Sequence, residues 1–295
     1  MDEGQGERDA RMPAGQINRS VFPPTKAEAA RQRHLNSVLS RIQGGLPDLA
    51  GSPRILDLAC GPGSWVFDAA KAYPHHQVVG VDDVPLMIAI AKEQALASGS
   101  NAMPLPNVAF HLAPELGALD FADGSFDFIH GRRLAPKLTR NTWPALVKEC
   151  LRLLAPGGIA QFTEWELPVT SSSACERYLE LIAQAYHLAG KSFSGGTRAL
   201  GISAALPHLV RSAGFSPVQC QTTLLDFSTD SPEHADVLQN AFVALRHIQP
   251  FLLAWPLAGS AEIEQLYQQA MTEMRAEDFT GGLVLLTVRG KKPDR

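Results

Sequence analysis

The stretch Ile55-Leu56-Asp57-Leu58-Ala59-Cys60-Gly61-Pro62-Gly63 decides the fold of this chain. It begins as an apolar run typical of a buried strand and ends in a turn of small residues, and a helical pattern follows from Gly63. Small residues let a backbone approach a ligand closely, and the first turn of a helix offers N–H groups without an intrahelical partner. The stretch indicates a strand, a tight turn and a helix. Taken alone, it also fits a turn that binds nothing.

A second apolar strand, Val79-Gly80-Val81-Asp82, ends in a carboxylate. Asp82 follows the glycine turn by about 20 residues, the separation at which an acid accepts hydrogen bonds from both hydroxyls of a ribose. The two stretches together predict a nucleotide-type ligand. The alternative for Asp82 is that it only caps the helix that follows.

A dinucleotide is the first ligand to weigh, because Ala59-x-Gly61-x-x-Ser64 loosely resembles the G-x-G-x-x-G/A pattern. Two features disfavour NAD. Asp57 stands at the strand end just before the turn, and the second turn glycine is Gly63 rather than residue 64.

Short apolar strands and helical patterns alternate along most of the chain. Strands that are apolar throughout, with helices between them, predict a mostly parallel sheet covered on both faces. We therefore expect an α/β fold with a Rossmann-like sheet of seven strands and a helical lid. The expected strands are 54–58, 77–81, 108–112, 126–129, 159–163, 218–227 and 282–288. One main helix is expected to start at residue 63, and four others to span 85–97, 142–154, 175–188 and 200–213.

The predicted organisation is a polar, disordered tail over residues 1–19 and one domain over 20–295. Thr25 is a plausible N-cap for the first helix of that domain. Within it we expect a cofactor-binding core at 46–166 and helical cap elements at 20–45, 167–199 and 232–276.

Composition excludes several classes of function. The chain has 295 residues, a net charge of -4 and a pI near 6.1, so no basic surface for nucleic acid is indicated. Its four cysteines form no C-x-x-C pair, which argues against a zinc site and a disulfide framework, and we predict no metal. Without a secretion signal or an apolar run of membrane length, a cytoplasmic protein that contacts no membrane is expected.

The quoted residues resemble a known family. Asp57-x-Ala59-x-Gly61-x-Gly63 resembles motif I of class I S-adenosylmethionine-dependent methyltransferases, and Gly80-Val81-Asp82 resembles their second motif. Residues 107–116, 121–130 and 153–158 resemble their third and fourth strands and the turn before the fifth. The stretches 126–132 and 162–166 are similar to a branch that contains bacterial natural-product methyltransferases and fungal regulators of secondary metabolism.

This resemblance implies that S-adenosyl-L-methionine binds across the carboxyl edge of the sheet. It implies that Asp82 contacts the ribose and that Met87 packs on the adenine. The alternative for Met87 is that it is an ordinary residue of the hydrophobic core. Glu115 would accept from the adenine amine, although Pro114-Glu115 stands where Gly-Asp is commoner. The implied cofactor-binding residues are Asp57, Ala59, Cys60, Gly61, Gly63, Asp82, Asp83, Met87, Pro114, Glu115, Leu116 and His130.

Methyl transfer depends mainly on positioning, and a base is needed only when the acceptor must lose a proton. We predict His130 and Glu164 as catalytic residues; the alternatives are that His130 only contacts the cofactor and that Glu164 is solvated. Glu166 shares the predicted face of Glu164. Arg31, Arg33 and His34 are candidates to close over the cofactor, or else form a solvated face.

The predicted function is methylation of a small, largely apolar metabolite by a monomer or homodimer, with O-methylation favoured over C- or N-methylation. The segment 232–276 is expected to be a mobile lid in which Phe251 and Trp255 select the acceptor and Pro250 and Pro256 interrupt the helices. Two alternatives share the same motifs: a cyclisation or isomerisation that uses the bound cofactor, and a regulator that transfers nothing.

Overall fold

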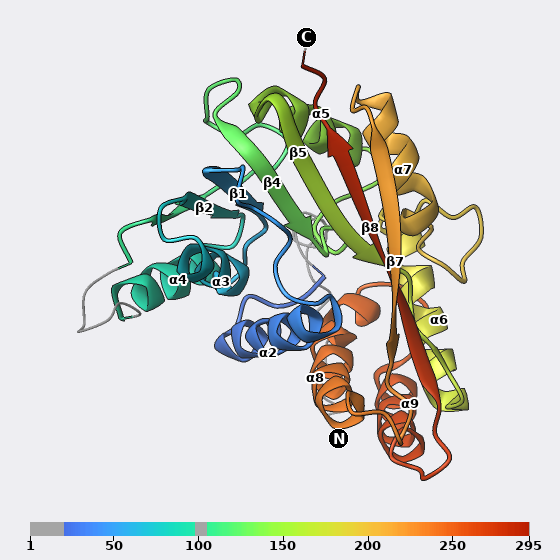
Figure 1. The fold of residues 1–295 in the computed structure, drawn as a ribbon. Coiled ribbons are helices and arrows are strands. Elements are labelled where there is room, and N and C mark those ends of the chain that lie inside the picture. The colour runs from blue at the N-terminus through green and yellow to red at the C-terminus, as the bar shows by residue number, and fades with distance from the viewer. Residues whose placement is uncertain (1–20, 98–104, 295) are drawn as a thin grey trace, which may run out of the picture.

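The computed structural model describes residues 21–97 and 105–294, and within them one mixed sheet of eight strands forms the centre of the molecule (Figure 1). The strand order is β3-β2-β1-β4-β5-β8-β6, and β7 pairs with β8. The predicted tail, residues 1–19, lies outside the described residues. The strands are β1 Arg54–Leu58, β2 Gln77–Asp82, β3 Val108–Leu112, β4 Phe126–Arg132, β5 Leu154–Trp165, β6 Val169–Thr170, β7 Val218–Asp226 and β8 Gly281–Lys291.

The first five strands in chain order run parallel, and β8 runs antiparallel to its partners β5, β6 and β7. This confirms the predicted Rossmann-like, mostly parallel sheet. The count of seven was one too low, because β6 was not predicted. It is only two residues long, and pairing with Gly281 and Gly282 of β8, rather than its own apolar pattern, makes it a strand.

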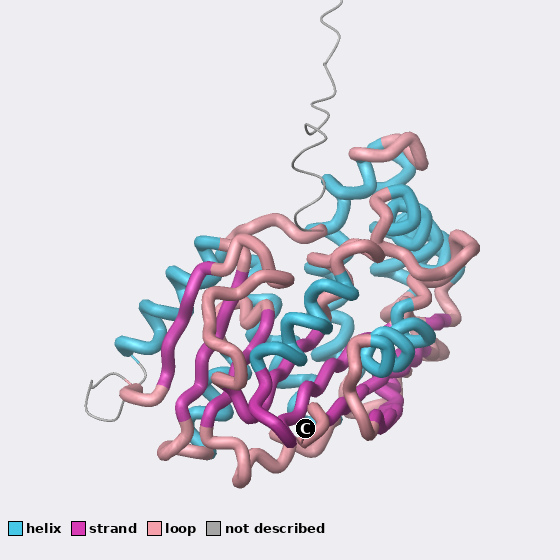
Figure 2. The backbone as a smooth tube through the Cα atoms, turned by 90° about the horizontal axis from the view of Figure 1, so that it is seen from above, coloured by secondary structure: helices cyan, strands magenta, loops and turns pink. Residues whose placement is uncertain are grey.

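Helices lie on both sides of the strands (Figures 1 and 2). They are α2 Lys26–Ile42, α3 Ser64–Ala72, α4 Pro85–Ala97, α5 Trp143–Leu153, α6 Ser173–Leu188, α7 Ile202–Ser212, α8 His234–Leu253 and α9 Ser260–Glu273. Within β1, Ile55 packs into the core on one face of the sheet and Leu56 into the larger core on the other. Both are fully buried, which explains why the strand is apolar throughout.

Thr25 begins α2 as predicted. Its side chain accepts a hydrogen bond from the N–H of Glu28 at 3.1 Å. The helix then packs against α8, to which His34 is tied by a 3.0 Å hydrogen bond between its Nε2 and the Asp236 carbonyl. α2 is thereby held below the carboxyl ends of the parallel strands (Figure 1).

Segment 232–276 contains α8 and α9, and α9 packs against α6. The predicted break at Pro250 is wrong, since α8 continues through it to Leu253. Proline removes one backbone hydrogen bond, but Ile248, Phe251 and Leu252 around it are all buried and hold the helix together. Pro256 does lie between the two helices.

Candidate functional site

The glycine turn after β1 has an unusual backbone. Ala59, Gly61 and Gly63 have φ angles of +52°, +55° and +85°, in the left-handed region that favours glycine. A Cβ atom on Gly63 would lie 2.8 Å from Cζ of Phe110, so residue 63 has no room for a side chain. Gly63 is also the N-cap of α3. The turn therefore brings bare backbone to the carboxyl edge of the sheet, as its sequence predicted.

Asp82 ties this turn to the end of β2. Its Oδ2 accepts from the N–H of Gly61 and its Oδ1 from the N–H of Val84, both at 2.9 Å. Nζ of Lys137, from the segment after β4, lies 3.0 Å from the same Oδ1 and also contacts Asp83. The carboxylate is fully buried, so a ribose hydroxyl would have to replace the Lys137 ammonium. The alternative that Asp82 caps the following helix is supported in part, because Asp82 accepts from the N–H of Val84, the residue just before α4.

His130 on β4 pairs with Asp57 on β1, its neighbour in the sheet register. The distance from His130 Nδ1 to Asp57 Oδ1 is 2.7 Å, and both side chains are almost completely buried. The imidazole also stacks on Trp65 of α3, with ring centroids 4.0 Å apart. Burial lowers the pKa of His130, while the carboxylate of Asp57 opposes that shift. His130 is thus held in one orientation by a carboxylate and an aromatic ring.

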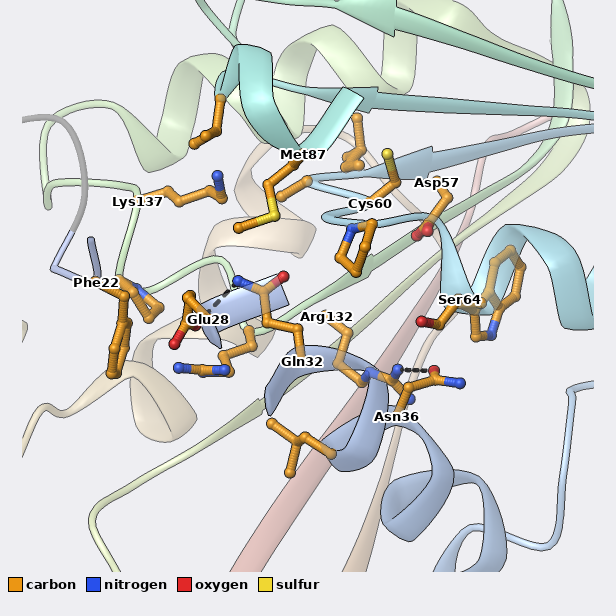
Figure 3. A pocket seen from close by; sticks show the side chains of 18 of the residues that line it. Phe22, Glu28, Gln32, Asn36, Asp57, Cys60, Ser64, Met87, Arg132 and Lys137 are labelled. Atoms are coloured by element: carbon orange, nitrogen blue, oxygen red, sulfur yellow. Dashed lines mark hydrogen bonds between the residues drawn. The ribbon is translucent and has the colours of Figure 1, made fainter. Parts of the chain in front are cut away.

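A cavity of about 100 Å³, the glycine-turn cavity, lies between this turn and α2 (Figure 3). Five of the predicted cofactor-binding residues line it: Asp57, Ala59, Cys60, Met87 and His130. Gly61, Gly63, Asp82 and Asp83 shape the adjoining backbone but do not line it. Pro114, Glu115 and Leu116 follow the edge strand β3 and also lie outside its lining. Their adenine contacts remain predictions.

The lining residues that were not predicted from the sequence include Gln32 and Asn36 of α2, Arg132 of β4, and Lys137. Arg132 donates to Asn36 Oδ1, and Asn36 donates to Asp68 at 2.9 Å. Arg132 could have been predicted from the sequence. It follows His130 by two residues on the same strand, and residues two apart on a strand point to the same side of the sheet. Figure 3 shows Gln32 beside Met87 and Cys60.

The apolar cavity is a second space of about 210 Å³, walled mainly by α2, α6, α8 and the segment after β5. It adjoins the glycine-turn cavity, and both are lined by Phe22, Leu35, Arg133, Pro136 and Trp165. The apolar wall carries side chains from distant parts of the chain, among them Val38, Leu179, Ile182, Leu225, Leu245 and Ile248.

Glu164 is the buried acid of the apolar cavity. Its carboxylate accepts from the N–H groups of Leu134 and Ala135, the first at 2.5 Å and the second at 3.4 Å. Burial raises the pKa of Glu164 to about 8, and the two N–H groups and Arg133 oppose that rise. The two residues predicted as catalytic therefore line different cavities, His130 the first and Glu164 the second. Glu164 is not solvated, since only 1% of its surface is exposed.

A family model described as a methyltransferase domain matches residues 55–158, the segment that builds the glycine turn, the carboxylate of β2 and His130. These residues are a class I S-adenosylmethionine-dependent methyltransferase domain. The demethylmenaquinone methyltransferase of Lactococcus lactis is 36% identical over 115 residues, 38% of this chain and 41% of that protein. The chain thus covers less than half of that relative's length.

Two further similarities extend beyond the matched segment. The malonyl-[acyl-carrier protein] O-methyltransferase of a Paenibacillus species is 28% identical over 214 residues, 70% of this chain and 71% of that protein. The structure of YcgJ from Bacillus subtilis covers 88% of this chain and 99% of its own, with a TM-score of 0.54 and 16% identity, which shows a shared fold. The apolar cavity lies largely outside the methyltransferase domain match.

The prediction for α2 was wrong about which face meets the cavity. Arg31 binds Glu28 and Asn240, His34 binds the Asp236 carbonyl, and Arg33 is exposed. None of the three lines the glycine-turn cavity; the lining residues of the helix are Glu28, Gln32, Leu35, Asn36 and Leu39, which repeat at helical spacing. The charge run 31–34 belongs to the faces that turn toward α8 and solvent.

Glu166 also lines the apolar cavity, and its carboxylate is engaged by backbone N–H groups. It accepts from the N–H groups of Leu200, Gly201 and Ser203 at 2.8 to 3.0 Å, around the first turn of α7. Phe251 and Trp255, the predicted acceptor contacts, do not line the apolar cavity. Phe251 packs edge-on against Tyr186 with ring centroids 5.7 Å apart, so it belongs to the core.

The residues of the glycine-turn cavity fit a ligand with an amino-acid end. The carboxylate of Asp57 and the guanidinium of Arg132 both line it and would meet an ammonium and a carboxylate group respectively. Met87 offers an apolar surface in the same cavity, and the backbone at Gly61 and Gly63 leaves the edge of the sheet free of side chains. No group of three or more metal-ligating side chains occurs within residues 21–97 and 105–294. None of the helices in that part of the chain is long and apolar enough to cross a membrane.

Proposed function

We propose that this chain transfers a methyl group from S-adenosyl-L-methionine to an oxygen of a small, largely apolar metabolite. The observation that carries the proposal is that the glycine-turn cavity and the apolar cavity adjoin and share Arg133 and Trp165. A cofactor in the first and an acceptor in the second would meet at these residues. The similarity to a malonyl-[acyl-carrier protein] O-methyltransferase supports oxygen as the accepting atom.

Residues at the ends of β1 and β4 hold the amino-acid end of the cofactor. Asp57 accepts from its ammonium group, and the orientation of Asp57 is fixed by His130. Arg132 binds its carboxylate, and Met87 packs on its adenine. His130 is therefore assigned a positioning role, since its Nδ1 is engaged by Asp57 and its ring is stacked on Trp65. When bound, S-adenosyl-L-methionine supplies a methyl group on a positively charged sulfur.

Glu164 receives the proton of the acceptor hydroxyl. Its pKa of about 8 lies close to neutral pH, where a general base works best. As this proton moves to Glu164, the acceptor oxygen uses a lone pair to bond the methyl carbon while the bond from sulfur to that carbon breaks. The products are the methylated acceptor, neutral S-adenosylhomocysteine and a protonated Glu164, which returns its proton to solvent.

The decisive experiment incubates the purified chain with S-adenosyl-L-methionine labelled in the methyl group and with fractionated metabolites of the source organism. We expect label in one or a few apolar products, and S-adenosylhomocysteine to bind in calorimetry. Binding of S-adenosylhomocysteine without any labelled product would favour a regulator or a reaction without methyl transfer. Failure to bind it would contradict the cofactor assignment itself.

A further inference from the structure

Arg133 stands where the two cavities meet. It follows β4 directly, its N–H donates to the Thr163 carbonyl at 3.0 Å, and it lines both cavities. Its φ angle is +58°, in the left-handed region that non-glycine residues rarely adopt. Such outliers cluster where a side chain must be placed for function. The backbone thus holds a long cationic side chain at the junction at a conformational cost.

The guanidinium of Arg133 makes no hydrogen bond and no ion pair with any residue in 21–97 or 105–294. It lies over the ring of Phe22, whose centroid is 4.6 Å away. Arg31 lies over the same ring at 4.9 Å, but Arg31 also binds Glu28 and Asn240. An arginine carries five N–H donors, and a largely buried cation without a partner is costly.

The nearby carboxylates are already engaged. Glu28 accepts from Arg31, from Gln32 at 3.0 Å and is 2.9 Å from His247 Nδ1, so both of its oxygens are used. Glu164 accepts from two backbone N–H groups. Glu166, which also lines the apolar cavity, accepts from three backbone N–H groups around the first turn of α7. No carboxylate of this wall is therefore bonded to Arg133, whereas Arg31, the other arginine of the wall, is bonded to Glu28.

We infer that the acceptor is an apolar acid, a carboxylic acid or an acidic phenol or enol, whose hydroxyl gives its proton to Glu164 and whose resulting anionic oxygen is bound by the guanidinium of Arg133. This inference rests on the proposed function, because it assigns the apolar cavity to the acceptor. An anion at Arg133 gives this guanidinium the partner that no described residue supplies, and the apolar remainder of the acceptor fills the cavity toward Ile182 and Ile248. It also places the reactive oxygen at the boundary with the glycine-turn cavity.

The test uses two probes with the same apolar chain, octanoate and 1-octanol, titrated by calorimetry into the full chain saturated with S-adenosylhomocysteine. We expect octanoate to bind about tenfold or more tightly than 1-octanol at neutral pH, since a charge-assisted hydrogen bond is lost in the alcohol. In Arg133→Met this preference should disappear, and Arg133→Lys should keep part of it. Arg33→Met is the matched control, because Arg33 is an exposed residue of α2 that lines neither cavity.

Three outcomes would overturn the inference. The first is that the unmodified chain binds the two probes equally, and the second is that it binds neither. The third is that Arg133→Met loses affinity for S-adenosylhomocysteine alone. The last result would mean that Arg133 holds the carboxylate of the cofactor instead. The comparison of probes in the unmodified chain needs no variant and so does not depend on whether Arg133→Met folds. If the unmodified chain prefers octanoate but does not bind S-adenosylhomocysteine, the proposed function fails while the anion site stands.

Discussion

The glycine-turn cavity and the apolar cavity adjoin, yet they are built from different kinds of structure. The first collects side chains from the ends of β1 and β4, which are neighbouring parallel strands, and places α2 over them. The second is walled by α2, α6 and α8, which are far apart in the sequence. The difference indicates that strand ends define the cofactor side, whereas packing of added helices defines the acceptor side.

The largest expected effect is on the apolar side, at Glu164. Glu164→Gln should lower kcat for O-methylation by about 10² to 10⁴-fold, because glutamine cannot accept the proton. The glutamine carbonyl can still accept from the N–H of Leu134, so the fold should persist. Affinity for S-adenosylhomocysteine, measured by calorimetry, should stay close to that of the unmodified chain.

The pH profile gives an independent check of the same role. The kcat of the unmodified chain should rise with pH up to about 8, since the base works only when ionised. A variant Glu164→Gln with nearly full turnover would show that the acceptor needs no base, and Glu164 would then have only its contacts to Leu134 and Ala135.

On the cofactor side, Asp57→Asn should weaken the binding of S-adenosylhomocysteine by about 1.5 to 3 kcal/mol, which is the contribution of a hydrogen bond to a charged group. Binding of octanoate to the apolar cavity should not change. Asp48→Asn serves as a control, because Asp48 is exposed in the loop before β1, lines neither cavity and accepts from the nearby Ala50 N–H. Equal losses for both ligands would mean that the two cavities do not act separately.

A smaller effect is expected when the apolar cavity is filled. Ala244 of α8 lines it, and Ala244→Leu should weaken acceptor binding by about tenfold, since an added side chain occupies space that the ligand needs. Ala235→Leu is the matched control on the same helix, at an exposed position. Should both changes leave the acceptor Kd untouched, the acceptor does not use this cavity.

The contrast between the cavities also explains what the sequence could predict. The strand ends were predictable because Ile55 to Gly63 and Val79 to Asp82 combine a buried apolar run with a turn or an acid. Helix α4 was predicted with its observed bounds, Pro85–Ala97. Asp57 and His130 then follow from neighbouring parallel strands, whose carboxyl ends share one edge of the sheet.

The acceptor side was less predictable, because helical spacing shows that a face is apolar but not what covers it. The sequence pattern around Phe251 fits a lid residue and a core residue equally well. Only the packing of Phe251 on Tyr186 shows that it belongs to the core. The face of α2 was misassigned for the same reason. Arg133 had no sequence signal at all, since its position depends on a positive φ angle and on cavities formed by three distant helices.

The smallest expected effect compares the stability of the two sides as a function of pH. In the folded chain Glu164 keeps a proton up to about pH 8, whereas in the unfolded chain its pKa returns to about 4.5. Between these values the folded state binds more protons, so the free energy of unfolding must fall as pH rises. The effect of His130 on stability has the opposite sign, because burial lowers its pKa and its contribution is lost as the pH falls below about 6.5.

Between pH 7 and 8.5 only the Glu164 effect should therefore be visible. We expect the unmodified chain to lose about 1 kcal/mol relative to Glu164→Gln over this range, measured by urea unfolding at each pH. Subtracting the variant removes the titration of all other groups, which both chains share. A difference that stays constant with pH would mean that the backbone N–H groups of Leu134 and Ala135 keep Glu164 ionised at neutral pH. The charge of Arg133 would then be balanced before any acceptor binds.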